Sequence, residues 1–498
     1  MGENMTKDYI LGIDAGTTKI KAGLFDIYEK MIDVESTNCK VSVGKNGEVE
    51  MNMYETWNAV IKVIKALLER NEGLKNKIIG IGVTGQGDGF WPLGKDKKPV
   101  YNAILWNDTR AKDIVLKQEE KVREICFKNN IIPLFTGANT AILKWFLEYS
   151  SKNIDNIRYI LHCKDWINYN LTGEISTDYT DASTAAFDIK KREYCEEYFQ
   201  ILGIEDYYKC FPKPTQSHEI IGFVNKLASE QTGIAEGVPV IAGAIDVSAV
   251  AYGVGVEKKG QACTIIGTTL CNEVLIESED VDLYNDIGST LCYVIPDKYL
   301  RVIASQSGTT LLEWIKNLLG PDMNFYDIEK IISNLPIGSE GVVIHPYLYG
   351  ERAPFKEPSA CGAILGLNAK HTKANIFRAA YESLAFAFYD CYSYMPYEIK
   401  EIFVAGGGSN SIILCQMFSD MINLPVKKNC NEENGILGVV KLVKKSLGIT
   451  DKNFEKNKDF EVFYPDYGNH LQYKNSFNLY KMLQVELRKF WEQRQVFS

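Results

Sequence analysis

Short apolar runs that end in glycine-containing turns recur along the chain and predict buried β-strands. Residues 9–13 lead into the turn DAGTT at 14–18, and residues 20–25 resume the apolar pattern. Apolar, β-branched runs on both sides of a tight turn are typical of a β-hairpin. Residues 78–84 and 401–404 are further strand-like runs, each followed by a glycine-rich segment.

A second turn of the same type predicts an internal duplication. Residues 263–266 lead into the sequence GTT at 267–269, and residues 272–276 resume a strand. The two turns lie about half a chain length apart, and each is set between strand-like runs. Self-similarity of this kind is the sequence signature of a repeated architecture. We therefore expect two related halves.

Helical periodicity between these strands predicts an α/β fold with mixed sheets. The helical patterns cover residues 57–68, 310–319, 374–387 and 414–422. A boundary is expected at residues 254–260, where GVEKKG interrupts an apolar run. Three parts result: residues 1–254, residues 255–450, and residues 451–498, whose helical stretch at 479–494 should pack on the second domain.

Composition and charge narrow the function classes. Of the 498 residues, 46% are hydrophobic and 24% are charged, as in ordinary globular proteins. A net charge of -9 argues against a protein that coats nucleic acid. Apolar runs stay well short of the roughly 18 to 20 residues of a membrane span, and no signal-peptide pattern is present, so we expect a cytoplasmic protein without a membrane partner. The oligomeric state stays open, a homodimer included.

The turn at residues 14–18 combines three features of a phosphate site. Gly16 lets the backbone approach a ligand, the hydroxyls of Thr17 and Thr18 can donate to phosphate oxygens, and Asp14 can hold a magnesium ion or its waters. Alone, the segment is equally compatible with a plain tight turn. Together with the second turn it predicts two hairpins that grip a nucleotide between the domains.

Two further segments carry candidate chemistry. Asp246 follows the apolar residues 238–242, where a charge is costly to bury without a partner. It is either a catalytic group or the cap of the helix that residues 247–252 would begin, and both can hold. The triple glycine at 406–408 lacks the spacing of a dinucleotide fingerprint, which favours a glycine surface for an adenine ring.

Polar and aromatic residues gather between residues 86 and 108 and suit a polyhydroxylated ligand. The alternative is a surface hairpin with buried tryptophans. Residues 94–98 (GKDKK) lack the Ser or Thr of a P-loop and predict a charged hairpin turn instead. The gathered residues are Gln86, Asp88, Trp91, Trp106, Asn107 and Asp108.

In this order, the motifs resemble those of the FGGY carbohydrate kinases, whose superfamily includes hexokinase, actin and the Hsp70 ATPase domain. The most specific match is GAILGL at 362–367 followed, after seven residues, by NIFRAAYE at 375–382. The resemblance runs from about residue 9 to about residue 448. It implies two actin/hexokinase-like (ribonuclease H-like) domains, a first one for sugar and a second one for nucleotide, with a cleft between them.

The resemblance also implies roles for individual residues, with ATP and Mg²⁺ as the cofactors. Asp14 would serve magnesium, Lys21 would face the transferred group, and Asp246 would be the general base. The nucleotide would be bound by Gly16, Thr17, Thr18, Gly267, Thr268, Gly308, Gly407, Gly408 and Ser411. The sugar or polyol would be bound by Gln86, Asp88, Trp106, Asp108 and Asp246.

The segment GQGDG at 85–89 bears on the substrate. D-xylulose kinases have GQMHG here and glycerol kinases have QRET, whereas the present segment resembles the erythritol kinase and L-xylulose kinase branches. We expect ATP-dependent phosphorylation of a terminal hydroxyl of a small neutral ketose or polyol in carbohydrate catabolism. The alternatives are a kinase of the same fold for glycerol, gluconate or a heptulose, and a non-catalytic nucleotide-binding sensor like actin or Hsp70.

Overall fold

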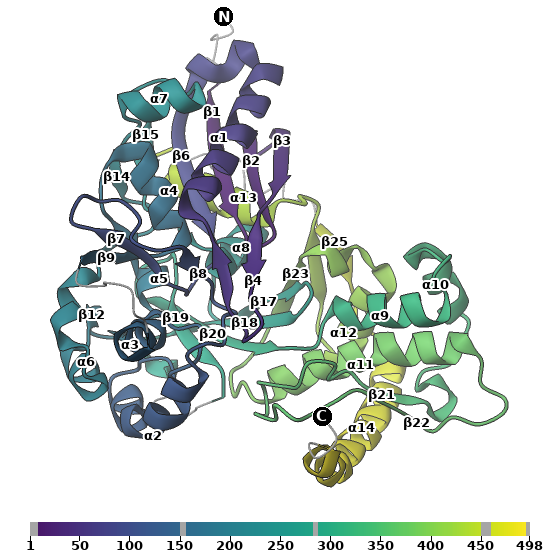
Figure 1. The fold of residues 1–498 in the computed structure, drawn as a ribbon. Coiled ribbons are helices and arrows are strands. Elements are labelled where there is room, and N and C mark those ends of the chain that lie inside the picture. The colour runs from purple at the N-terminus through teal and green to yellow at the C-terminus, as the bar shows by residue number, and fades with distance from the viewer. Residues whose placement is uncertain (1–7, 150–155, 282–286, 450–459, 495–498) are drawn as a thin grey trace, which may run out of the picture.

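The computed structural model describes residues 8–149, 156–281, 287–449 and 460–494 and shows two mixed β-sheets (Figure 1). The first sheet has the strand order β14-β15-β6-β1-β2-β3, and β16 also pairs with β6. Its strands are β1 (Tyr9–Ala15), β2 (Lys19–Asp26), β3 (Met31–Asn38), β6 (Ile78–Gly85), β14 (Ile220–Phe223), β15 (Pro239–Ile241) and β16 (Ala244–Ile245).

The second sheet has the strand order β19-β20-β18-β17-β23-β24-β25. Five short sheets pair β10 with β13, β11 with β12, β21 with β22, β7 with β9, and β4 with β5 and β8. The strands of the second sheet are β17 (Gln261–Ile266), β18 (Leu270–Glu277), β19 (Ser289–Cys292), β20 (Lys298–Ser305), β23 (Glu401–Ala405), β24 (Val426–Asn429) and β25 (Phe460–Phe463). The short strands are β4 (Val41–Val43), β5 (Val49–Met51), β7 (Trp91–Gly94), β8 (Ala103–Ile104), β9 (Ile157–Leu161), β10 (Thr177–Asp178), β11 (Phe187–Asp188), β12 (Glu193–Tyr194), β13 (Pro214–Thr215), β21 (Val343–His345) and β22 (Ala363–Leu365).

The two sheets share one pattern of strand pairing. β1 pairs with β2 antiparallel and with β6 parallel, just as β17 pairs with β18 antiparallel and with β23 parallel. Beyond these, β15 and β14 extend the first sheet as β24 and β25 extend the second. This agrees with the duplication that the two Gly-Thr-Thr turns predicted, and it places each turn at the same position of its sheet.

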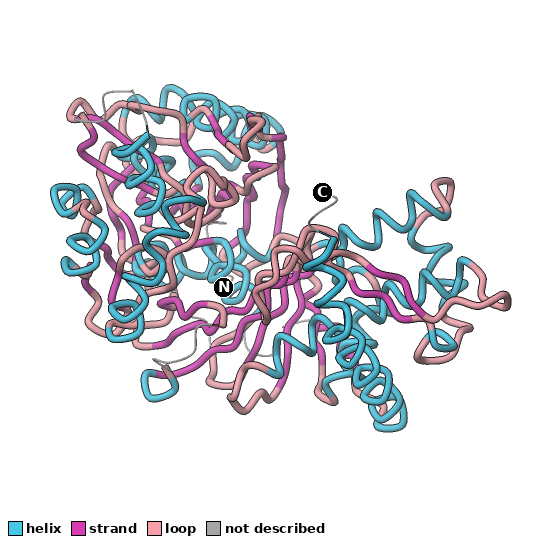
Figure 2. The backbone as a smooth tube through the Cα atoms, turned by 60° about the horizontal axis from the view of Figure 1, so that its bottom comes forward, coloured by secondary structure: helices cyan, strands magenta, loops and turns pink. Residues whose placement is uncertain are grey.

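The predicted helices all form, because each buries an apolar face; three of them also have a side-chain cap, whereas the one at residues 309–319 has none. They lie within α1 (Met53–Arg70), α9 (Thr309–Leu319), α11 (Lys373–Ser393) and α12 (Ile412–Ile422). The Asn52 side chain caps α1 by accepting from the Glu55 amide at 3.0 Å. Figure 2 shows the strands of each half lying among helices. The other helices include α2 (Lys112–Lys128), α3 (Asn139–Tyr149), α4 (Cys163–Thr172), α5 (Tyr179–Ala182), α6 (Glu196–Leu202), α7 (Lys226–Thr232) and α10 (Phe325–Ile332).

Helices α8 (Asp246–Val254) and α13 (Asn434–Ser446) link the two halves. α13 belongs to the second half, yet it packs on α8 and on β1 and β6 of the first sheet (Figure 1). α8 in turn contacts β17 and β23 of the second sheet. Glycines allow this close packing, since a Cβ at Gly82 would lie 2.8 Å from the Cβ of Val439. The start of α13 is thereby brought to the end of β1.

The C-terminal helix α14 (Tyr467–Arg494) begins twelve residues before the predicted stretch at 479–494. Its first turns are rich in polar residues, so periodicity does not mark them. They are helical because they dock on the second half, where the Tyr473 hydroxyl accepts from Arg378 at 3.1 Å and Phe477 is buried. α14 packs against α12 and β21. The predicted boundary at residues 450–451 lies outside the described residues, and within them no helix is long and apolar enough to cross a membrane.

Candidate active site

The hairpin β1–β2 presents the first predicted phosphate turn. The Gly16 amide donates to the Lys19 carbonyl at 3.0 Å and closes the turn, which leaves Thr18 exposed. Asp14, one residue before the end of β1, lies opposite Lys21 of β2. The strand pairing therefore places a carboxylate and an ammonium side by side below the turn.

Trp106 joins this turn to the predicted substrate residues. Its indole Nε1 donates to the Thr17 hydroxyl at 3.1 Å, and that hydroxyl donates to Gln86 Oε1 at 3.1 Å. Gln86 is buried, and its Nε2 has no hydrogen-bond partner within the described part of the chain. A buried donor without a partner costs free energy unless a ligand satisfies it. The structure thus brings together residues predicted for phosphate and for sugar.

Carboxyl groups with raised pKa values surround this network. Burial raises the pKa of Asp14 to about 6, that of Asp88 to about 7 and that of Asp246 to about 8. Repulsion from Asp14, Asp181 and Asp88 adds to the shift at Asp246. Asp88 has a φ of 54°, in the left-handed region, which Asp adopts more readily than most other non-glycine residues. Several perturbed carboxyl groups in one place are typical of a functional site.

Replacement of Asp246 by Asn should make the ligand-free protein more stable at high pH than at low pH, relative to the parent. Between about pH 4 and pH 8 the folded state binds a proton at Asp246 that the unfolded state has released, so the stability of the parent falls with rising pH. Asn has no such proton. Thermal unfolding midpoints at pH 5 and pH 8 should show the advantage of Asp246→Asn growing with pH. Asp113→Asn, at an exposed position of α2, is the control, and a pH-independent difference for Asp246→Asn would contradict the prediction.

Asp246 itself is the first residue of α8, and its Oδ1 accepts from the Val247 amide at 2.7 Å. The preceding Gly243 has a φ of 74°, and a Cβ there would overlap the Val83 carbonyl. The backbone thus passes β6 at contact distance at Gly243, and this close approach fixes the position of Asp246 three residues later. The predicted role of Asp246 as the helix cap is wrong, because Ile245 occupies the cap position and Asp246 is already the first helical residue. Its role as a catalytic group stays a prediction.

Lys21 makes an ion pair with Glu433, a residue that the sequence did not single out. The Lys21 ammonium donates to both Glu433 carboxylate oxygens at 2.8 and 2.7 Å. Glu433 directly precedes α13, and its charge also raises the pKa of Asp14. No local pattern points to Glu433, because the contact depends on α13 of the second half packing on the first sheet.

The second Gly-Thr-Thr turn is held by the start of α9. The Thr309 amide and hydroxyl both donate to the Gly267 carbonyl at 2.9 Å, and the Thr310 hydroxyl donates to the Thr268 carbonyl at 3.0 Å. Gly308 lies so close that a Cβ would overlap Thr268. The structure therefore brings Gly267, Thr268 and Gly308 together, as predicted.

The triple glycine lies beside this turn. Gly408 is close enough to Ile266 that a Cβ would overlap its side chain, whereas a Cβ at Gly407 would meet nothing within 4 Å. Gly407, in the 3₁₀ turn η5 (Gly407–Asn410), is exposed and leaves a bare backbone surface on which a planar ring could lie. The Ser411 hydroxyl caps α12 by accepting from the Leu414 amide at 3.1 Å.

Two predicted ligand residues are placed differently. Asp108 is buried and its oxygens are already used: Oδ2 accepts from the Val49 amide at 2.6 Å, and both oxygens accept from Arg110. Asp108 therefore orders the loop after β8 and has no oxygen free for a substrate. Trp91 is fully buried in β7, as the alternative reading of a hairpin with buried tryptophans expected, while Trp106 is half-buried. Asn107 is exposed.

Sequence reasoning also missed a buried charge cluster next to the site. Lys164 is fully buried, and its ammonium lies 2.6 Å from Asp165, 3.0 Å from Asp178 and 3.0 Å from Asp181. His162 Nδ1 lies 3.1 Å from Asp165. His162, Asp165 and Asp181 have the spacing of metal ligands, but the Lys164 ammonium already supplies the cation that these carboxylates need. In the sequence, the one feature that indicates this cluster is the presence of charged residues in the otherwise apolar stretch 160–167.

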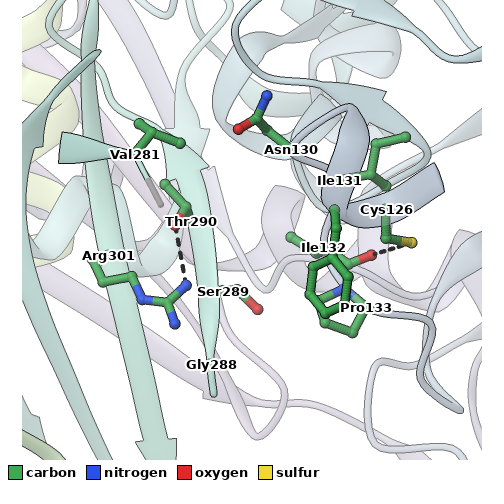
Figure 3. A pocket seen from close by; sticks show the side chains of 11 residues that line it. Cys126, Asn130, Ile131, Ile132, Pro133, Val281, Gly288, Ser289, Thr290 and Arg301 are labelled. Atoms are coloured by element: carbon green, nitrogen blue, oxygen red, sulfur yellow. Dashed lines mark hydrogen bonds between the residues drawn. The ribbon is translucent and has the colours of Figure 1, made fainter. Parts of the chain in front are cut away.

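A separate hollow lies between the segment after α2 and strands β19 and β20 (Figure 3). Arg301 reaches it and donates to the Thr290 hydroxyl at 3.2 Å, while the Cys126 thiol donates to the Ile132 carbonyl at 3.6 Å. None of the predicted site residues lines this hollow. It is therefore distinct from the cluster around Asp246.

Models of known protein families match both halves of the chain. The N-terminal domain of the FGGY family of carbohydrate kinases matches residues 9–253, and the C-terminal domain of that family matches residues 264–444. The fold and the match define a phosphotransferase with two actin/hexokinase-like domains. The chain belongs to the FGGY family of carbohydrate kinases. Kinases of this family use ATP, generally with Mg²⁺, and act on a sugar or polyol.

Individual relatives are similar over nearly the whole length. The chain is 28% identical to an erythritol kinase from Brucella abortus over 456 residues, which covers 89% of this chain and 88% of the relative. It is 28% identical to a probable L-xylulose kinase from Haemophilus influenzae over 95% of this chain and 97% of the relative. It is 29% identical to a xylulose kinase from Staphylococcus epidermidis over 97% of this chain and 98% of the relative.

Solved structures confirm the predicted fold. A ligand-bound xylulose kinase from Lactobacillus acidophilus superposes with a TM-score of 0.89 at 25% identity, over 99% of this chain and 100% of that one. A gluconate kinase from the same species superposes with a TM-score of 0.88 at 25% identity, over 97% and 98% of the two chains. The resemblance inferred from the motifs, with its erythritol, L-xylulose and xylulose kinase branches, is thus confirmed.

Proposed function

We propose that this kinase phosphorylates a terminal hydroxyl of a small neutral ketose or polyol, with Asp246 as the general base. The observation that carries the proposal is the position of Asp246 among Asp14 and Asp88, beside the Trp106–Thr17–Gln86 network. In this arrangement the residues around Asp88 hold the acceptor, the turns at Gly16 and Gly267 hold the phosphates, and Gly407 and Gly408 lie under the adenine ring. Residues 1–254 then carry the sugar site and residues 255–450 most of the nucleotide site.

Asp246 would accept the proton of the attacking hydroxyl. Phosphoryl transfer needs little covalent help from the protein, and positioning together with charge neutralisation supplies most of the acceleration. A carboxylate with an ordinary pKa is a weak base for an alcohol. Burial and neighbouring carboxylates raise the pKa of Asp246 to about 8, which brings it near the range in which a general base is effective at neutral pH.

Asp14 is the residue that fits a magnesium ion. Its carboxylate has no hydrogen-bond donor among the described residues and lies near the charges of Glu433 and Asp246, so a divalent cation would relieve repulsion there. Such an ion, when bound with ATP, neutralises charge on the phosphates. Lys21 would reach the transferred group from β2, with Glu433 holding its ammonium close to the turn.

The acceptor is inferred to be neutral because the site is rich in carboxylates. Asp88 is an acceptor-only group when ionised, so it takes hydrogen bonds from hydroxyls and repels an anion. Two of the similar relatives are named erythritol kinase and probable L-xylulose kinase, and erythritol and L-xylulose are a neutral polyol and a neutral ketose. The gluconate kinase among the similar structures makes an aldonate the acceptor to compare.

The direct test is ADP release with MgATP across a panel of acceptors with four to seven carbons, including erythritol, L-xylulose, D-xylulose, glycerol and gluconate. We expect the highest kcat/KM for a neutral ketose or polyol. Gluconate as the best acceptor would overturn the substrate class and leave the kinase activity intact. A protein that binds ATP but releases no ADP with any acceptor would instead support a nucleotide-binding sensor.

Replacement of Asp88 by Ala should raise the KM for the acceptor strongly and change the KM for MgATP little. Hydrogen bonds to a charged group contribute about 1.5 to 3 kcal/mol each, which corresponds to roughly 10- to 150-fold in kcat/KM. Steady-state kinetics with the best acceptor measures both constants. Asp108→Asn is the informative comparison, because it should affect stability through Arg110 while leaving the acceptor KM near the parent value. A kcat/KM within twofold of the parent for Asp88→Ala would contradict this account of the pocket.

A further inference from the structure

Arg352 stands on a rigidly held segment of the second half. The preceding Glu351 is buried, and its carboxylate accepts from the Gln306 amide at 2.8 Å, from the Ser305 hydroxyl at 2.7 Å and from the Ser307 hydroxyl at 3.2 Å. The same carboxylate accepts from the amide of Arg352 at 2.9 Å. The backbone of Arg352 is therefore tied to the end of β20.

The guanidinium of Arg352 reaches the predicted substrate residues of the first half. Its Nε–H donates to the Ala304 carbonyl at 2.8 Å, which sets the direction of the side chain. Its central carbon then lies 5.9 Å from the ring centroid of Trp106, within the range of a cation–π contact. The positive charge also acts on Asp88, where it works against the rise in pKa that burial causes.

Among the residues that the structure describes, no acceptor lies within hydrogen-bond distance of the other N–H groups of this guanidinium. In the part of the chain that the structure describes, Nε is the only side-chain atom of Arg352 with a hydrogen-bond partner, and no carboxylate forms an ion pair with it. The side chain is exposed at the place where the second half meets Trp106. A guanidinium that is held in position and has N–H groups to spare is suited to donate hydrogen bonds to a ligand.

We propose that Arg352 is an acceptor-binding residue supplied by the second half, which donates to an oxygen of the sugar or polyol held between Asp88 and Trp106. This deepens the proposed function and rests on its placement of the acceptor at Asp88. Hydrogen bonds from the guanidinium go to hydroxyl or carbonyl oxygens, while Asp88 takes hydrogen bonds from hydroxyls. The pocket thereby recognises the acceptor both through its oxygen atoms, which accept from Arg352, and through its hydroxyl protons, which are donated to Asp88. Acceptor binding then requires both halves of the protein.

The experiment compares Arg352→Ala with the full-length parent. For the best acceptor of the parent we expect a KM at least tenfold higher and a KM for MgATP within twofold. Guanidinium chloride at low millimolar concentration should restore part of the lost kcat/KM. The kcat/KM of Arg352→Lys should lie between those of the parent and the Ala variant, because Lys keeps the positive charge but lacks the planar, two-pronged set of N–H donors. Arg488→Ala is the matched control: Arg488 lies 6.0 Å from the Phe355 ring on the exposed side of α14, and its loss should leave both constants unchanged.

Binding of the acceptor alone, measured by calorimetry, separates a loss of contact from a loss of folding, and circular dichroism reports the latter. An acceptor KM less than threefold higher in Arg352→Ala, or equal increases in the KM values for acceptor and MgATP, would overturn the assignment. Failure of the proposed function looks different. If the parent prefers gluconate over every neutral acceptor, the substrate class is wrong, and Arg352 is then tested with gluconate by the same comparison.

Discussion

Asp246→Asn should lower kcat for the best acceptor by about 100-fold or more while the KM for MgATP changes little. Asn has nearly the same shape as Asp, and its side chain cannot take up the proton of the attacking hydroxyl. General bases contribute typically 10² to 10⁴ in rate, so the loss should be at the level of chemistry rather than binding. Single-turnover measurements with saturating MgATP isolate that step.

Unfolding cannot mimic this result, because burial makes the charge of Asp246 unfavourable for folding and Asn removes the charge. The variant should therefore bind MgATP and unfold at a midpoint no lower than that of the parent at pH 7. Asp113→Asn, on the exposed side of α2, should retain full activity. A variant at position 246 that keeps more than a tenth of the parental kcat would rule out Asp246 as the base.

Lys164→Met should destabilise the protein by about 3 to 5 kcal/mol, the range found when one partner of a buried ion pair is removed. Met fills a similar volume, but three buried carboxylates lose the ammonium that lies 2.6 to 3.0 Å from them. For a domain of about 250 residues, such as the first half of this chain, this corresponds to a drop of roughly 6 to 20 °C in the unfolding midpoint. Differential scanning calorimetry measures the shift.

The matched control is Lys128→Met. Lys128 lies 3.9 Å from Glu197, with 67% of its side chain and 58% of that of Glu197 exposed, so the pair should contribute little. Lower pH should lessen the loss in Lys164→Met, since Asp181, whose pKa burial raises to about 6, then takes up a proton. Equal decreases in the unfolding midpoint for Lys164→Met and Lys128→Met would show that the buried cluster contributes no more to stability than an exposed ion pair.

Much of the architecture is predictable from short segments. The hairpins around Gly16 and Gly267, the helices α1, α9, α11 and α12, and the duplication are all readable because strand alternation, helical periodicity and turn residues are local properties. The start of α14 at Tyr467 is not readable, since polar residues there are held helical by docking on the second half. In such segments, tertiary contacts rather than the helical preference of the local sequence determine the secondary structure.

The candidate site divides in the same way. In the sequence, glycine turns and a carboxylate after an apolar run indicate Asp14, Gly16, Gly267 and Asp246 as candidate site residues. Asp108 looked equivalent to Asp88 in the sequence, yet packing against Val49 and Arg110 uses its oxygens. Burial and the contact with Val49, a residue 59 positions earlier, distinguish Asp108 from Asp88, and neither can be read from the neighbouring residues.

By itself, the sequence determined the two hairpins, the helices α1, α9, α11 and α12, the repeated plan of the two halves and the residue types of a phosphate-transferring site, because each follows from spacing along the chain. The tertiary structure alone decided which charges meet. Lys21 meets Glu433 because α13 crosses to the first sheet, and Arg352 meets Trp106 because the two halves approach at that point. Electrostatic interaction depends on distance and desolvation, and folding sets both between segments hundreds of residues apart.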